Sequence, residues 1–260
     1  MENEILLSRH VRNGAIYAEI VLNRPDKGNA LTMPMLERLK SLAQELANDR
    51  TVRLVVIRGA GRFFCTGGDI KAWGALSPRQ MAEEWILPGI SVMDSISALP
   101  QPVIAAIHGH AIGGGLELAL ASDLRLGLRS AKFGTPEVGI GMIAGWTGVR
   151  KLAETIGFAR AQHLTLLGNL ITAGQALQWG LITELADSPE QLELSLNTWI
   201  DRLLANSPIA MSLTKGLLAS GRADTRQLHA AAAEVAAASA DCAEGVRAFA
   251  EKRAPVFPNR

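Results

Sequence analysis

The sequence predicts an α/β fold with a substantial parallel sheet, followed by a largely helical C-terminal third. Residues 54–57 and 103–107 are continuous apolar runs, a pattern typical of strands buried on both faces of a parallel sheet. Segments with helical spacing of apolar residues alternate with these runs, and this alternation favours an α/β architecture. The chain has 260 residues, 48% of them hydrophobic, so it can form a sizeable core.

The first sixty residues predict a strand, a turn, a helix and a second strand. Residues 15–22 are rich in β-forming residues, and residues 23–29 have turn chemistry. Apolar side chains from Met35 to Leu46 then recur at helical spacing, before the strand at 54–57. A second unit of the same kind is expected further along the chain. Its elements are a strand at 103–107, a short helix at 113–121 and a strand at 124–128.

The last third of the chain is predicted to be mostly helical. Thr172 has the chemistry of a helix N-cap, and Gly180 ends that helix. Residues 181–185 predict a last strand, and Pro189 opens a long amphipathic helix. The alanine-rich segment 230–240 suits close helix packing, inside the protein or across a subunit contact.

The charge balance argues against a polyanionic partner. There are 26 Lys and Arg against 25 Asp and Glu, a net charge of +1, which provides no strong field for nucleic acid. The acidic N-terminus lacks the pattern of a signal peptide, and no apolar segment approaches the ~18–20 residues needed to span a bilayer. We therefore expect a cytoplasmic protein with no nucleic-acid or membrane partner.

The metal-binding residue types show no ligand pattern. The two cysteines, Cys65 and Cys242, are far apart in the sequence and are expected to be reduced thiols. The five histidines fall at no recognised ligand spacing. We expect no metal site.

Two glycine-containing turns are the first candidates for chemistry. Gly67 and Gly68 follow the first apolar run, and three glycines at 113–115 lead from the second run into a helix. Glycines at a helix start expose unpaired N–H groups at the positive end of the helix dipole, which suits an anion or an oxyanion. Both turns are also compatible with simple tight connections. Neither has the spacing of a dinucleotide or phosphate loop.

Two glutamates are candidate proton-transfer groups. Glu117 lies in an otherwise apolar helix, one turn from Gly113 and Gly114, where burial would raise its pKa. Alternatively, it caps the helix backbone. Glu137 lies twenty residues further on, in a loop bounded by glycine and proline, and could equally be a surface acid.

Together these features resemble the crotonase superfamily, the enoyl-CoA hydratase/isomerase family, over nearly the whole chain. The resemblance implies a spiral of repeated ββα units with a catalytic core at 1–195 and a C-terminal helical trimerisation region at 196–260. The motifs that carry it, in chain order, are Leu22-Asn23-Arg24-Pro25 with Asn29-Ala30-Leu31, residues 65–71, residues 113–117, Pro136-Glu137, residues 141–148 and Phe249-Ala250-Glu251-Lys252-Arg253.

The resemblance also implies roles for the candidate residues. The N–H groups of Gly68 and Gly114 would form an oxyanion hole for the thioester oxygen of an acyl-CoA, and glycine allows that close approach. Members with glutamate at both positions resemble hydratases. Glu117 would assist attack by water on the β-carbon of a 2-enoyl-CoA, and Glu137 would deliver a proton to the α-carbon.

The resemblance places coenzyme A, as part of the substrate, near the two turns, and it implies no prosthetic group. Lys71 and Lys252 match positions that contact its phosphates, and Lys252 can come from a neighbouring subunit of a trimer or dimer of trimers. Each lysine could equally be a solvated surface charge. The other expected substrate contacts are Arg24, Lys27, Ala30, Gly67, Asp69, Ile70, Gly145, Trp146 and Phe249.

The chain departs from the family pattern at Trp146, where small residues are usual. If its indole faces the acyl group, it shortens or reshapes the pocket or stacks on an unsaturated or aromatic chain. Otherwise it packs as core or at a subunit contact. His108 and His110 are expected to support the backbone, and Trp73, Trp85 and Trp179 to be core or lid residues.

Three other functions remain open at this stage. One is a different crotonase reaction, such as double-bond isomerisation or carbon–carbon cleavage or hydrolysis, and one is non-catalytic acyl-CoA binding. The third is RNA binding through the early helix, which is disfavoured because that helix mixes Arg38 and Lys40 with Glu37 and Glu45.

Overall fold

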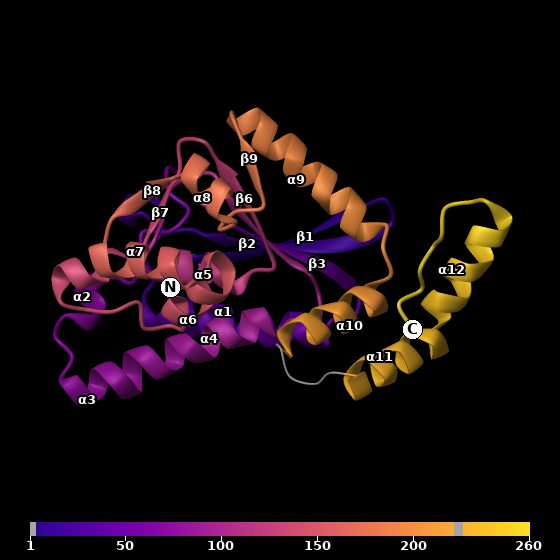
Figure 1. The fold of residues 1–260 in the computed structure, drawn as a ribbon, viewed down its shortest axis with the longest axis horizontal. Helices are drawn as coiled ribbons and strands as arrows, with labels where there is room; N and C mark the ends of the chain where they lie inside the picture. Colours follow the sequence, from indigo (N-terminus) through magenta and orange to yellow (C-terminus); the bar gives the residue numbers. More distant parts are fainter. Residues whose placement is uncertain (1–3, 221–225) are drawn as a thin grey trace.

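The computed structural model describes residues 4–220 and 226–260 and has the predicted α/β architecture (Figure 1). In this part of the chain, the main sheet has six strands in the order β1-β2-β3-β4-β6-β9. The β1–β2 pair is antiparallel and all other pairs are parallel. The strands are β1 Ile5–Arg12, β2 Ala15–Leu22, β3 Val52–Gly59, β4 Val103–Ile107, β6 Leu124–Leu128 and β9 Glu184–Ala186.

A small second sheet lies beside the glycine turns. It contains β5 (Ala111–Ile112), β7 (Lys132–Gly134) and β8 (Leu170–Thr172), in the order β5-β7-β8. The β5–β7 pair is parallel, so both strands run the same way toward the residues that follow them. Residues 113–117 and Glu137 therefore leave this sheet near one another.

Helices cover both sides of the main sheet. The α-helices of the N-terminal half are α1 Met33–Asn48, α2 Ile70–Trp73, α3 Pro78–Gln80, α4 Leu87–Ser97 and α5 Gly114–Ala121. Short 3-10 helices occupy η1 Pro25–Lys27 and η3 Pro136–Ile140, and η2 Met81–Ile86 is a π-helix between α3 and α4. The C-terminal half contains α6 Gly148–Ile156, α7 Phe158–Leu167, α8 Ala173–Trp179, α9 Pro189–Leu204, α10 Pro208–Ala219, α11 Arg226–Ala238 and α12 Ala240–Glu251.

Strand β3 shows why its apolar run has no polar alternation. Val55 and Ile57 point into the larger core with α1 and α4, whereas Leu54 and Val56 point into a second core with α9. All four side chains are fully buried, so both faces of the strand are covered. The prediction of a parallel strand buried on both faces is confirmed.

The second sheet and the helices between residues 70 and 97 are not among the predicted elements, and two further differences have a clear physical reason. Strand β1 is not predicted, although Asn13 and Gly14 both have positive φ and form the hairpin turn between β1 and β2. The last strand begins at Glu184 rather than at residue 181. The N–H groups of Leu181 and Ile182 still bond to the α8 carbonyl of Ala176, which delays entry into the sheet.

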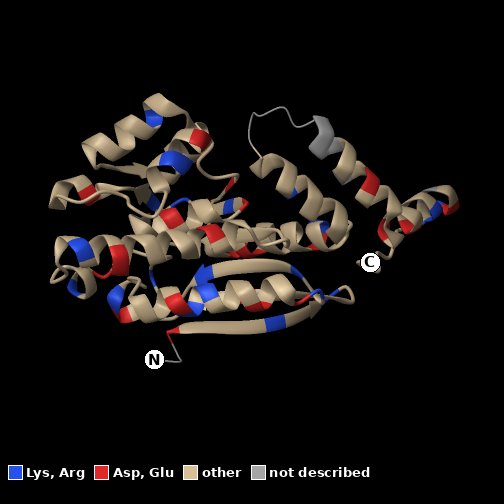
Figure 2. Ribbon diagram, turned by 90° about the horizontal axis from the view of Figure 1, so that it is seen from below, with Lys and Arg blue, Asp and Glu red and all other residues tan. Residues whose placement is uncertain are grey.

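The C-terminal helices extend away from the body that contains the sheets (Figure 1). The boundary expected after residue 195 falls inside α9, whose buried face (Leu192, Leu196, Ile200) packs on the main sheet. Helix α9 is therefore continuous with the core. Within the described residues, no helix has both the length and the hydropathy needed to cross a bilayer. Lys and Arg residues are interspersed with Asp and Glu residues along the ribbon (Figure 2).

Candidate active site

The two glycine turns lie side by side. A parallel bridge joins Cys65 to Ala111: the Cys65 N–H donates to the His110 carbonyl at 3.1 Å, and the Ile112 N–H donates to the Cys65 carbonyl at 3.0 Å. Gly67 has φ +110°, and a Cβ there would lie 3.1 Å from the Ile112 carbonyl. The close approach therefore requires glycine at 67.

Gly68 and Gly114 present free backbone donors to the same cavity. Gly114 is the first residue of α5, where N–H groups have no partner within the helix. Gly68 lies in a bridge whose hydrogen bonds use the carbonyl of Gly67 and the N–H of Asp69. Among the described residues, neither glycine N–H has a backbone acceptor. These are suitable donors for an oxyanion.

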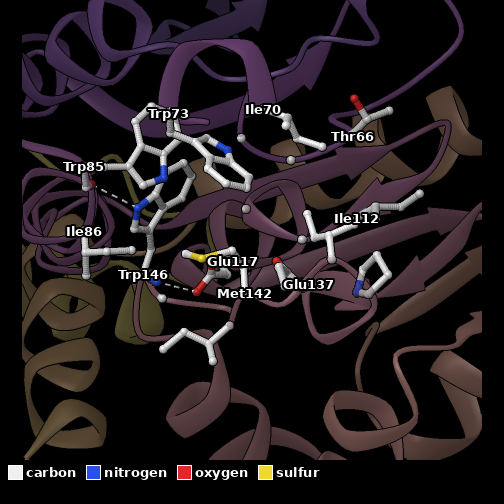
Figure 3. Close-up of a pocket in the computed structure, with 18 residues that line it drawn as sticks. Thr66, Ile70, Trp73, Trp85, Ile86, Ile112, Glu117, Glu137, Met142 and Trp146 are labelled. Carbon is white, nitrogen blue, oxygen red and sulfur yellow. Dashed lines mark hydrogen bonds between the residues drawn. The ribbon is translucent and has the colours of Figure 1, made fainter. Parts of the chain in front are cut away.

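The cavity that both glycines line has a volume of about 230 Å³ and is mostly apolar (Figure 3). Glu117 and Glu137 are its only charged lining residues in the described chain. The other side chains come from the first turn, α2, η2, β5, η3 and the loop before α6. They include Ile70, Trp73, Trp85, Ile86, Ile112, Ile140, Met142, Ile143 and Trp146.

Glu117 is buried, with only 3% of its surface exposed. Its Oε1 accepts hydrogen bonds from the backbone N–H groups of Trp146 at 2.7 Å and Gly148 at 2.8 Å. A Cβ at residue 148 would lie 2.6 Å from the Glu117 side chain, so glycine is needed there. Burial, reinforced by the charge of Glu137, raises the pKa of Glu117 to about 8 despite these hydrogen bonds.

Glu137 comes from η3 and faces the same cavity. Its Oε2 is buried and has no hydrogen-bond partner among the described residues. Burial raises the pKa of Glu137 above its usual range. A Cβ on Gly113 would lie 2.7 Å from its Oε1, so the second turn is shaped around this carboxyl group. At neutral pH the glutamate pair therefore retains a proton, and one carboxyl oxygen is left for a ligand.

The predicted substrate-contact residues at the first turn fall into two groups. Arg24 donates to Asp69 at 2.6 Å and to the Ala30 carbonyl at 3.0 Å, and Asp69 also caps α2 through the Lys71 N–H. Hydrogen bonding from Arg24 lowers the pKa of Asp69. Arg24 and Asp69 thus hold the turn in place, while the Lys27 and Lys71 side chains are exposed and free to meet an anionic ligand.

Lys252 does not reach this cavity in its own chain. Lys252 follows α12 and is exposed, and α12 lies far from α2 and the cavity (Figure 1). Phe249 is part of α12, but its side chain is outside the described residues. Gly145, by contrast, lines the cavity.

The histidines beside the second turn bond to backbone. The His108 Nε2 lies 2.9 Å from the Gly61 carbonyl, and the His110 Nδ1 accepts from the Lys132 N–H at 3.3 Å. Neither lines the cavity. The described residues contain no group of three or more His, Cys, Asp or Glu that could hold a metal ion.

Four further side chains line the cavity without having been predicted to do so: Trp73, Trp85, Ile86 and Met142. Trp73 and Trp85 were expected in the core or a lid, and no local motif distinguishes those places from a pocket wall. Trp146 is 3% exposed and also lines the cavity, so it is both core and wall.

Comparison with known proteins decides the family. The sequence model described as Enoyl-CoA hydratase/isomerase matches residues 12–260. The chain belongs to the enoyl-CoA hydratase/isomerase family. YngF of Bacillus subtilis, named for the same family, is 37% identical and covers 92% of this chain and 94% of its own.

Other members of the family agree. The crotonyl-CoA hydratase of Syntrophomonas wolfei is 33% identical, with 97% of both chains covered. The crystal structure of an enoyl-CoA hydratase from Bacillus anthracis superposes with a TM-score of 0.91 at 32% identity, covering 99% of this chain and 100% of that one. The predicted crotonase fold is thereby confirmed, and the chain is similar to enzymes of this superfamily throughout its length.

Proposed function

We propose that this protein is an enoyl-CoA hydratase, which adds water reversibly to a 2-enoyl-CoA thioester to give a 3-hydroxyacyl-CoA. One observation carries the proposal: two buried carboxyl groups share an apolar cavity with two unpaired glycine N–H groups. Addition of water to a conjugated thioester needs this combination, because charge develops on the thioester oxygen while one proton leaves water and another joins carbon.

The glycine donors would polarise the substrate. The thioester oxygen would accept hydrogen bonds from Gly68 and Gly114, which draws electron density from the double bond and makes the β-carbon electrophilic. As the enolate forms, negative charge on this oxygen increases, and the positive end of α5 stabilises it further. Donors fixed by the Cys65–Ala111 bridge would need little reorganisation during the reaction.

The glutamates would move the protons. Glu117 would take a proton from water while the water oxygen bonds to the β-carbon. Glu137 would give a proton to the α-carbon, and the double bond between the two carbons becomes a single bond. The backbone bonds to Trp146 and Gly148 would hold the Glu117 carboxyl in position. Exchange with solvent would then return the pair to its starting protonation state.

The remaining expectations for binding and assembly belong to this proposal. Lys27 and Lys71 would meet the phosphates of coenzyme A, and Lys252 and Phe249 would reach the site of a neighbouring subunit in a homotrimer or a dimer of trimers. Coenzyme A would enter only as part of the substrate, with no prosthetic group. The protein would act in the cytoplasm.

Double-bond isomerisation is the second candidate. Both hydrogen bonds to the Glu117 Oε1 come from backbone, and they would suit a structural carboxyl as well as a catalytic one. An isomerase resembling family members with a single acid would then use Glu137 alone.

Product analysis separates the two reactions. Purified protein is mixed with crotonyl-CoA and, separately, with a 3-enoyl-CoA, and the products are resolved by chromatography. A hydratase forms 3-hydroxybutyryl-CoA from crotonyl-CoA. Conversion of the 3-enoyl-CoA to its 2-enoyl isomer without hydration would favour the isomerase, and binding of both esters without turnover would contradict both assignments.

A further inference from the structure

Three tryptophans form one wall of the cavity and have no part in the proposed proton transfers. Trp73, Trp85 and Trp146 come from α2, η2 and the loop before α6, and they gather on the side opposite Glu137 (Figure 3). A Cβ on Gly68 would lie 2.7 Å from the Trp85 ring, 3.4 Å from that of Trp73 and 3.6 Å from that of Trp146. The indoles therefore pack directly against the oxyanion-hole glycine.

The Trp146 indole packs against the backbone of helix α4 at Gly89. A Cβ on Gly89 would lie 2.1 Å from the Trp146 Nε1, so any side chain there would displace the ring. The same Nε1 donates to the Trp85 carbonyl at 3.2 Å. Glycine normally weakens a helix interior. Here its missing side chain lets the indole lie against the backbone, which fixes the ring in one place.

The π-helix η2 completes this wall. It carries Trp85 and Ile86, and a Cβ on Gly145 would lie 2.5 Å from the Ile86 Cδ1. The Trp85 and Trp146 rings are tilted against each other with centroids 5.3 Å apart. Single π-turns occur often at functional sites. The loop 145–146 and the helix η2–α4 are thus fitted to each other through two glycines.

The low exposure of Trp85 and Trp146 shows that these two rings close the wall rather than offer a stacking surface, whereas Trp73 is half-buried. Trp146 and Trp85 are 3% and 4% exposed. Stacking on an aromatic acyl group needs a free ring face of comparable size. Almost none is available on these two indoles, so an aryl group would have to displace them.

The charge of the cavity lining restricts the ligand further. Its only charged lining residues in the described chain are the two glutamates, so a distal carboxylate buried there would meet no cation.

We propose that Trp146, packed against Gly89, closes the far end of the acyl pocket and makes the site selective for short, uncharged acyl groups. Butyryl and crotonyl groups fit, whereas medium-chain, aromatic and dicarboxylic groups do not. The inference rests on the proposed function for the class of ligand, an acyl-CoA, but not on the reaction performed.

Binding of saturated esters tests the proposal without turnover. Titration calorimetry compares butyryl-CoA, decanoyl-CoA, 3-phenylpropanoyl-CoA and adipyl-CoA, none of which can be hydrated. An open apolar tunnel would favour decanoyl-CoA, by about fourfold for each buried methylene. We expect the opposite order, with butyryl-CoA bound about tenfold or more tighter than each of the other three.

Substitutions at Trp146 and Gly89 then test whether the Trp146 indole causes this preference. Trp146→Ala should strengthen decanoyl-CoA binding about tenfold or more and change butyryl-CoA binding less than about threefold. Gly89→Ala, which displaces the indole without removing it, should also alter the butyryl-to-decanoyl ratio. Trp146→Phe, a smaller change that preserves the core, should relax the ratio partially. Trp179→Phe is the matched control, since Trp179 does not line the cavity, and it should leave the ratio unchanged.

The outcomes separate this inference from the proposed function. Equal or tighter binding of decanoyl-CoA, 3-phenylpropanoyl-CoA or adipyl-CoA by the wild type would overturn it, as would an unchanged ratio in folded Trp146→Ala. If Trp146→Ala does not fold, an unchanged ratio in Trp146→Phe and Gly89→Ala overturns it instead. The expected ratios in a protein that does not hydrate crotonyl-CoA would uphold the pocket and refute only the hydratase assignment.

Discussion

Replacing Glu117 with Gln is expected to stabilise the protein, and the gain should grow with pH. The buried carboxyl has a pKa of about 8, against 4.5 for an unperturbed one. Between these two values the folded state keeps a proton that the unfolded state releases, so the free energy of unfolding of the wild type falls as pH rises. Glutamine keeps both backbone hydrogen bonds at its oxygen and has no such proton.

The size of the effect follows from that interval. At about 1.4 kcal/mol for each pH unit, the distance from 4.5 to 8 corresponds to a ceiling of about 5 kcal/mol. The gain should be near zero at pH 4.5, rise through the interval and level off above pH 8. Burial of the glutamine amide offsets part of it, so we expect about 2–4 kcal/mol at pH 8.

Urea unfolding at pH 5 and pH 8 measures this difference. Wild type, Glu117→Gln and the control Glu37→Gln, on the exposed side of α1, are compared at equal protein concentration. The control should differ little from wild type at either pH. A Glu117→Gln gain that is the same at both pH values, or a loss of stability at pH 8, would show that Glu117 is not held neutral by burial.

Two further predictions concern catalysis, and a third concerns stability. The kcat/KM for hydration should fall as pH rises above about 8, because the glutamate pair then loses the proton that Glu137 must deliver, and a profile that stays flat from pH 7 to pH 10 would contradict this account. Gly148→Ala should reduce kcat about 100-fold, because its Cβ would lie 2.6 Å from the Glu117 side chain. The control Gly139→Ala should not reduce kcat, because its Cβ would have no atom within 4 Å. Equal steady-state rates of the two variants would refute the packing argument. Gly113→Ala, at φ +54° and 2.7 Å from the Glu137 Oε1, should lower the free energy of unfolding by about 1–3 kcal/mol in urea titrations, and an unchanged value would contradict it.

Much of the fold could be predicted because its signals are local. Strand β4 has the bounds that its apolar run predicts, and α8 begins at the Thr172 cap and ends at Gly180. Strand β1 was missed because its pattern is weak on its own and depends on pairing with β2 across the Asn13-Gly14 turn. The start of β9 depends on helix-end hydrogen bonds that composition does not reveal.

The candidate site divides in the same way. The glycine turns and Glu117 could be predicted from local sequence. Close approach of two backbone segments requires consecutive glycines, and a single glutamate within an apolar helix is visible as an exception to the pattern. The packing of the Trp146 indole could not be predicted, because it depends on Gly89, a residue 57 positions earlier and in the helix α4. Such a fit exists only after α4 and the loop before α6 have packed together.

Hydration of crotonyl-CoA tests the central claim most directly. The decrease in absorbance of the conjugated thioester is followed for wild type, Glu117→Gln and Glu137→Gln, and 3-hydroxybutyryl-CoA is quantified as the product. The account predicts turnover by the wild type and a loss of about 100-fold to 10,000-fold in each variant, with the fold retained. Full hydratase activity in either variant, or no hydration by a wild type that binds the ester, would contradict it.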